Sequence, residues 1–151
     1  MAKNLLLEHS EELATKCELL CKSISGNSNT VFQLRKSSSS VFANITEAQY
    51  PQSLADMLSK FKIARKECAE TEGWLKMLYN TKVIDEATFK TYRNLSGRIQ
   101  RILTSSCITI ENKINSKKDR KGAVLFSHLK EFPTAKCHGE LLFFNLFLPN
   151  Y

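Results

Sequence analysis

The sequence predicts an all-α protein, an antiparallel up-down four-helix bundle with an irregular C-terminal extension. Three observations support this fold class. Apolar residues recur at helical spacing through four long segments. The 151 residues include only five glycines and three prolines, the residues that most often interrupt helices. No segment before residue 119 alternates apolar and polar residues as a half-buried strand does. Long amphipathic helices joined by short loops pack as antiparallel neighbours.

The first two helices are expected at residues 4–24 and 30–48. Gly26 lies between them among asparagines and serines, which favour the left-handed conformations that end helices. Four consecutive serines at residues 37–40 look like a linker, but the apolar spacing continues through them. We therefore expect them inside the second helix, where their small side chains let another helix approach closely.

The third and fourth helices have clear start signals. Ser53 is the expected N-cap of the third helix, which should end near Asn80. Asp85 is the expected N-cap of the fourth. The fourth helix is expected to end near residue 118, ahead of Gly122.

We divide the chain into a bundle at residues 1–118 and an extension at residues 119–151. The extension contains four expected helix breakers, which are Gly122, Pro133, Gly139 and Pro149. It also contains an apolar run at residues 141–148, which is too short to span a bilayer. The run could form an added helix or strand over an apolar groove, or an exposed interaction segment. It could equally be an out-of-frame extension, and the sequence leaves these three hypotheses open.

The net charge of +7 is unevenly distributed. Residues 1–59 carry five basic and six acidic residues, a net charge of −1. Residues 60–118 carry thirteen basic and six acidic residues, a net charge of +7. Residues 119–151 have a net charge of +1. This excess in the second half of the bundle predicts a basic surface, whose usual partner is a polyanion.

Residue usage indicates a cytoplasmic protein without catalytic or metal sites. The first residues lack the apolar region of a secretory signal, and no run approaches the roughly 18 apolar residues of a membrane span. The five cysteines are an odd number, which argues against a disulfide framework. Cys17 and Cys21 share one helix face and are expected in the core. No nucleophile, phosphate-loop or metal motif is visible, so we expect no enzyme activity, no cofactor and no metal.

Basic side chains form the strongest candidate site. Four of them on the fourth helix fall within about 140° of arc, namely Lys90, Arg93, Arg98 and Arg101. Lys62 and Lys66 form a second basic pair, four residues apart on the third helix. Such stripes neutralise phosphates and release counterions, which gives sequence-tolerant binding of nucleic acid. The alternative is an ordinary solvated helix face.

A second set of residues is expected to be structural. Glu72 falls on the apolar stripe of the third helix, where a carboxylate needs a partner. Arg65, seven residues earlier, is the expected partner. With Asn44 and Glu47 they predict a polar network that fixes helix register or a subunit contact. Trp74 lies off the stripe and is expected to pack in an interface, with base stacking as the alternative.

Two segments resemble a known family. Residues 33–48, QLRKSSSSVFANITEA, and residues 63–75, IARKECAETEGWL, are similar to bacterial four-helix bundle proteins of the 23S ribosomal RNA intervening-sequence type. Residues 4–8 are also similar. The resemblance covers about residues 4–118, and the extension has no counterpart in it. The segment at residues 37–40 contains more serine than the family pattern does.

The resemblance implies an up-down bundle that assembles into a homopentameric ring. The related accessory variability determinants of diversity-generating retroelements are basic pentamers that bind nucleic acid and a reverse transcriptase. Two functional hypotheses follow. The first is a homo-oligomeric, non-catalytic bundle that binds RNA or DNA through its basic outer surface. The alternative is a protein-interaction scaffold that docks a larger enzyme, such as a reverse transcriptase, without binding nucleic acid directly.

Overall fold

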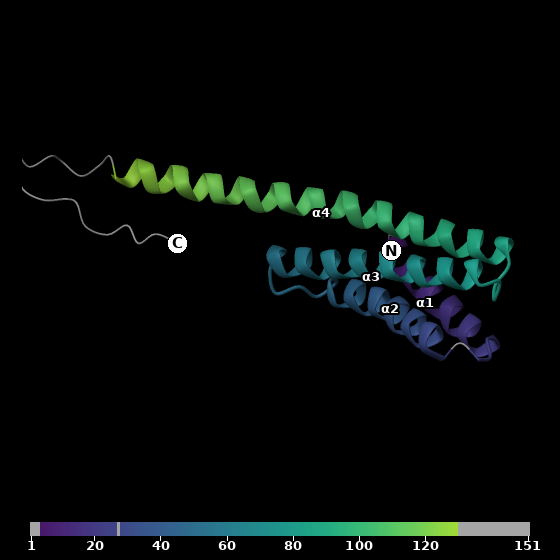
Figure 1. The fold of residues 1–151 in the computed structure, drawn as a ribbon. Helices are drawn as coiled ribbons and strands as arrows, with labels where there is room; N and C mark the ends of the chain where they lie inside the picture. Colours follow the sequence, from purple (N-terminus) through teal and green to yellow (C-terminus); the bar gives the residue numbers. More distant parts are fainter. Residues whose placement is uncertain (1–3, 27, 130–151) are drawn as a thin grey trace, which may run out of the picture. The chain divides into compact units, whose positions relative to one another are not determined.

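The computed structural model describes residues 4–26 and 28–129, which form four helices and no strand (Figure 1). In chain order the helices are α1 Leu5–Ser23, α2 Ser28–Glu47, α3 Leu54–Asn80 and α4 Glu86–Leu129. The predicted all-α four-helix bundle is therefore confirmed. The first three helices end within two residues of the expected positions.

Side-chain caps fix where three of the helices begin. The Ser53 hydroxyl accepts a hydrogen bond from the backbone N–H of Asp56 at 3.1 Å. The Asp85 carboxylate accepts one from the N–H of Thr88 at 2.7 Å. Hydrogen bonds from the side chain and then the backbone of Thr88 lower the pKa of Asp85. Asn4 caps α1 in the same way. Each cap satisfies an N–H that has no partner inside its helix, so these starts are encoded locally, as predicted.

Antiparallel packing is visible in the pairs that link neighbouring helices. Along α2 and α3, Thr30 lies against Met77 while Glu47 pairs with Lys60, so the two helices run in opposite directions. Along α3 and α4, Gln100 Nε2 donates to the Arg65 carbonyl at 3.0 Å. Tyr92 on α4 donates through its hydroxyl to the carbonyl of Lys16 on α1 at 2.9 Å, which closes the ring of four helices.

All four helices contribute side chains to one core. The largest fully buried aliphatic side chains are Leu13, Leu34, Val41, Ile45, Leu75, Leu78, Ile99 and Leu103. Most of these recur at the helical spacing from which the four helices were predicted. Apolar burial of this kind is the main stabilising term in a small domain.

The serine run lies inside α2, as expected. Ser37 and Ser38 are buried, with at most 1% of their surface exposed. Thr71 of α3 donates to the Ser37 hydroxyl at 3.0 Å, so the two helices meet through small side chains that bond each other. A buried hydroxyl without such a partner would be destabilising.

The expected end of α4 was wrong. The helix continues through Gly122 to Leu129. One glycine disfavours a helix by only about 1 kcal/mol, and the lysine, arginine and alanine beside it are good helix formers. The breakers expected at Pro133, Gly139 and Pro149 and the apolar run at residues 141–148 lie outside the described residues.

A chain that ends at Lys118 should fold. Among the residues whose burial is described, the core ends at Ile110, with Ile114 packed on its edge, and the truncation keeps all of this packing. We expect its helical circular dichroism signal and its melting temperature to match those of the full chain, with equal or better solubility by sedimentation. An unfolded or insoluble truncated chain would place the end of the folding unit beyond residue 118.

Candidate nucleic-acid interface

The outer side of α4 carries four exposed basic side chains: Lys90, Arg93, Arg98 and Arg101. On the opposite side, Leu95, Ile99 and Leu103 are 5%, 0% and 0% exposed. Between Glu86 and Glu111 the helix contains no acidic residue. This part of α4 therefore presents positive charge from Lys90 to Arg101, over about three turns.

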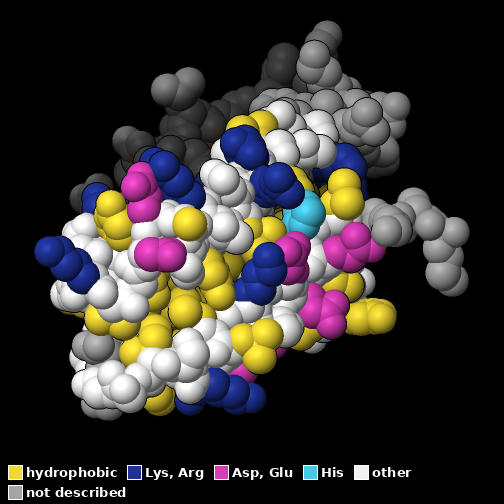
Figure 2. All heavy atoms as spheres, turned by 90° about the vertical axis from the view of Figure 1, so that its right-hand side faces the viewer, with side chains coloured by type: hydrophobic (Ala, Val, Ile, Leu, Met, Phe, Trp, Pro, Cys, Tyr) yellow, Lys and Arg dark blue, Asp and Glu magenta, His cyan; other side chains and the backbone are white. Residues whose placement is uncertain are grey.

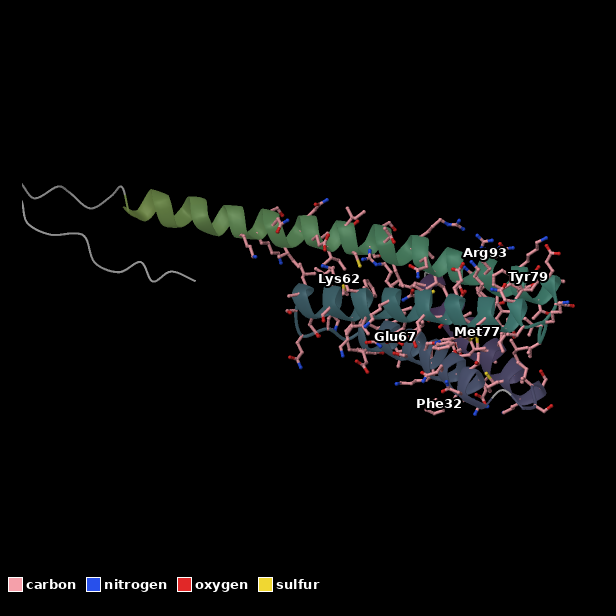
Figure 3. All side chains as sticks on the ribbon, viewed as in Figure 1. Phe32, Lys62, Glu67, Met77, Tyr79 and Arg93 are labelled. Carbon is pink, nitrogen blue, oxygen red and sulfur yellow. The ribbon has the colours of Figure 1, made fainter. Side chains whose placement is uncertain are left out.

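The third helix adds two exposed lysines. Lys62 and Lys66 both lie on the surface of α3, and Lys62 reaches across to Glu111 of α4 at 2.7 Å. Figure 3 labels Lys62 and Arg93 at separate points along the α3–α4 pair. The structure thus places all six predicted binding residues on the outside of two neighbouring antiparallel helices.

Three of the six basic residues are paired with carboxylates. Besides Lys62, Lys90 Nζ lies 2.7 Å from Glu86, and Arg93 Nε lies 3.4 Å from Glu72. The hydrogen bond to Glu86 raises the pKa of Lys90. Because these pairs are exposed to water, they contribute little to stability. They can therefore be exchanged for phosphate at small cost.

The other three residues have no such partner. Within the described part of the chain, no carboxylate lies within 4.0 Å of the charged groups of Lys66, Arg98 or Arg101. Arg98 borders a cavity of about 230 Å³ between α1 and α4, together with Glu12, Lys16 and Asn94, and Glu12 is paired there with Lys16. These three cations are the ones most available to an external anion.

The end of the bundle differs from the side of α4. Figure 2 looks at the molecule from the right-hand side of Figure 1, where the chain turns from α3 into α4. On that face lysine and arginine side chains are interspersed with aspartate and glutamate. Asp85 and Glu86 lie at this turn, close to Lys82. A mixed surface gives no net attraction for a polyanion, so the candidate interface is the side formed by α3 and α4.

The four residues expected to form one polar network are separate. Asn44 donates to the Ser40 carbonyl at 2.8 Å within α2. Glu47 pairs with Lys60. These interactions hold α2 locally and against α3, and they involve neither Arg65 nor Glu72.

Glu72 pairs with Arg93 and not with the expected Arg65. Residues seven apart on one helix are about 10.5 Å apart along its axis, whereas antiparallel packing brings α4 directly alongside. The carboxylate is also about one-third exposed, so it is less buried than its position on the stripe suggested. Trp74 is partly buried and donates to Glu70 at 3.1 Å.

Comparison with known proteins places the chain in a family. The family model of the 23S rRNA-intervening sequence protein matches residues 3–105, more than half of the chain. The chain belongs to this family. A crystal structure of a protein with unknown function from the S23 ribosomal protein family of Bacteroides thetaiotaomicron is similar, with 33% identity and a TM-score of 0.65. That match covers 68% of this chain and 98% of the other. No match was found among curated proteins.

The predicted resemblance to the intervening-sequence type is thereby confirmed. The matched region of this 23S rRNA-intervening sequence family member ends at residue 105, just beyond Arg101. All six basic residues of the candidate interface lie within it. The later part of α4, with Cys107 and Ile110, lies outside the matched region.

A layer of small polar groups and thiols crosses the core of this family member. Cys17 of α1 and Cys68 of α3 are fully buried, and Cys68 donates to the Ser96 carbonyl of α4 at 3.6 Å. Burial raises the pKa of both thiols to about 12. Helical spacing predicted the burial of Cys17, Cys21 and Cys68, but it did not predict the hydrogen bond of Cys68 to Ser96 of α4.

Two further observations concern the described residues. They hold no group of three or more histidine, cysteine, aspartate or glutamate side chains arranged to bind a metal ion. None of their helices is long and apolar enough to cross a membrane.

Alkaline pH should destabilise the fold. The usual pKa of 9.0 for Cys17 and Cys68 and of 10.0 for Tyr92 is raised by burial to about 12 in each case. The unfolded chain therefore releases these protons first, and the free energy of unfolding should fall as pH rises from about 9 to about 12, by up to about 1.4 kcal/mol per pH unit for each buried group.

Urea unfolding at a series of pH values in this window, under reducing conditions, measures the slope. A double variant, Cys17→Ala with Cys68→Ala, should show a shallower decrease because two of the groups are gone. An unfolding free energy that stays constant from pH 9 to pH 11 would contradict the burial of these thiols.

Proposed function

We propose that this protein is a cytoplasmic, non-catalytic homo-oligomer that binds RNA or DNA through the outer surface of α3 and α4. The observation that carries the proposal is the stretch of α4 between Glu86 and Glu111. It has four exposed basic side chains and no acidic residue. The matched crystal structure is itself described as a protein with unknown function, so the proposal rests on this chain's own surface.

The physical basis is exchange of counterions. A polyanion that lies along α4 releases the ions condensed on its phosphates when arginines replace them. Arg98 and Arg101 have no carboxylate to give up among the described residues. To bind phosphate, Arg93 has to give up only its ion pair with Glu72, which is exposed to water. Binding of this kind is strong at low salt and tolerant of sequence.

Self-association is supported by apolar residues on the outside of α3. Ile63 and Met77 are 40% and 47% exposed, and Trp74 is partly buried between them. Their spacing of 11 and 14 residues from Ile63 puts the three on one side of the helix. Exposed apolar stripes often mark protein contacts. An oligomer, five-fold as the family resemblance suggests, would repeat the basic surface and raise avidity.

A second candidate is a protein-interaction scaffold that docks a larger enzyme, such as a reverse transcriptase, without direct contact to nucleic acid. Two observations favour it. Three of the six basic residues are already paired with carboxylates. Exposed apolar side chains such as Phe32, at 58% exposure, also lie away from the basic surface. This hypothesis expects one co-purifying protein and no nucleic acid.

Replacing Arg93, Arg98 and Arg101 together with glutamine should weaken binding of nucleic acid and flatten its salt dependence. For each phosphate on duplex DNA that a subunit no longer neutralises, the slope of log K against log salt should become shallower by about 0.9. Circular dichroism should be unchanged, because these side chains point away from the core. The measurement is fluorescence anisotropy over a range of salt concentrations.

The matched control removes the same charge elsewhere. It replaces three exposed lysines outside the interface with glutamine, namely Lys22, Lys36 and Lys82. This control should keep most of the salt slope. Equal losses of affinity in both variants would mean that net charge alone drives binding, and no affinity of the wild type at low salt would end the proposal.

Light scattering at micromolar concentration should show an oligomer. Met77→Glu should lower the measured mass, because it puts a charge into the stripe proposed to mediate self-association. Leu19→Glu, at an equally exposed position on α1 (60%), is the control and should leave the mass unchanged. A monomeric wild-type protein would remove the oligomer from the proposed function.

A further inference from the structure

Gly97 lies in the middle of the basic surface of α4. Arg93 and Arg101 lie one turn before and after it, and Arg98 follows it directly. A Cβ atom built at Gly97 would meet no atom within 4 Å. Glycine is less favourable than alanine inside a helix. Nothing in the described chain thus requires glycine here, and the missing side chain leaves room outside the helix.

The aromatic side chains of the basic stretch of α4 are occupied in packing. The aromatic residues of α4 between Glu86 and Glu111 are Phe89 and Tyr92. Phe89 stacks on Tyr79 with ring centroids 5.0 Å apart, and Tyr92 is buried with its hydroxyl bonded to α1. Proteins that bind single strands combine positive charge with exposed aromatic platforms. On this stretch of α4 the charge is exposed while both aromatic rings are packed, and Trp74, the other stacking candidate, lies on α3 and donates to Glu70.

The spacing of the cations fits a rigid, densely charged rod. From Lys90 to Arg101 the helix extends about 16 Å. That length of duplex carries about ten phosphates, twice the number on one of its strands. Arg93 and Arg98 stand at opposite edges of the stripe, about 140° apart around the helix. They are therefore placed to contact phosphates on either side of a helix that lies against a duplex.

We propose that α4 binds the sugar-phosphate backbone of double-stranded nucleic acid, with Gly97 as the point of closest approach. The inference rests on the proposed function and adds to it the class of ligand. Arginine side chains provide the hydrogen bonds to phosphate, and the missing side chain at Gly97 lets the backbone come close enough for three of them to reach at once. Duplex RNA and duplex DNA share this chemistry.

The test uses the full chain and compares a duplex DNA, a duplex RNA and an unstructured single strand of equal length at one salt concentration. Both duplexes should bind about tenfold more tightly than the single strand. A preference for one of the two duplexes would show whether the bound sugar-phosphate backbone is that of DNA or of RNA. Tighter binding of the single strand would overturn the inference.

The variant Gly97→Ala separates a role in binding from a role in stability, because the two measured quantities should change in opposite directions. It should raise the melting temperature, because alanine favours the helix, and at the same time weaken duplex binding by about tenfold, equivalent to about 1.4 kcal/mol. Gly73→Ala is the comparison on the other helix of the interface: Gly73 has equally free space for a Cβ, but it lies on α3, on the face of Lys62 and Lys66, and away from the proposed point of closest approach on α4. It should raise the melting temperature and leave binding unchanged.

The outcomes separate the two proposals. If Gly97→Ala leaves duplex affinity unchanged while the arginine-to-glutamine variant lowers it, the duplex inference fails and nucleic-acid binding stands. If neither duplex nor single strand binds at low salt, both fail. If Gly97→Ala and Gly73→Ala weaken duplex binding equally, Gly97 is not the point of closest approach and the inference is overturned.

Discussion

The surface of this protein depends on how α4 is seated in the bundle. Ile99 and Leu103 are completely buried and Leu95 is nearly so, which fixes the rotation of the helix about its axis. A rotation by one residue, about 100°, would carry Arg98 toward the core and expose an isoleucine. The cost of burying a guanidinium without a partner far exceeds that of any surface interaction. The basic stripe therefore faces outward because the apolar stripe faces inward.

Hydrogen bonds then fix the position of α4 along its neighbours. Tyr92 donates to the carbonyl of Lys16 on α1, and Gln100 donates to the carbonyl of Arg65 on α3. Apolar packing alone is non-directional, whereas these bonds would break if the helix slid by one turn. Their register decides which charges meet across the α3–α4 surface, including Arg93 with Glu72.

Small residues permit the close packing inside the bundle. The Thr71–Ser37 hydrogen bond joins α3 to α2 at a fully buried position, and buried thiols occupy neighbouring space. Groups of this size allow helix backbones to approach, and hydroxyls that bond, as those of Ser37 and Thr71 do, avoid a desolvation cost. At Gly97 the absence of a side chain leaves space on the outside that the described residues do not fill.

The sequence by itself determined the features that depend on neighbours along the chain. The four helices, the caps at Ser53 and Asp85, the placement of the serine run in α2 and the outward orientation of Arg101 all follow from helical periodicity and capping, which are local. Only the tertiary structure decided the partner of Glu72 and the pairing of Lys62 with Glu111. These depend on the register between helices, which is set by packing at positions far apart in sequence. The continuation of α4 past Gly122 was missed because one unfavourable residue is outweighed by the cooperative helix around it.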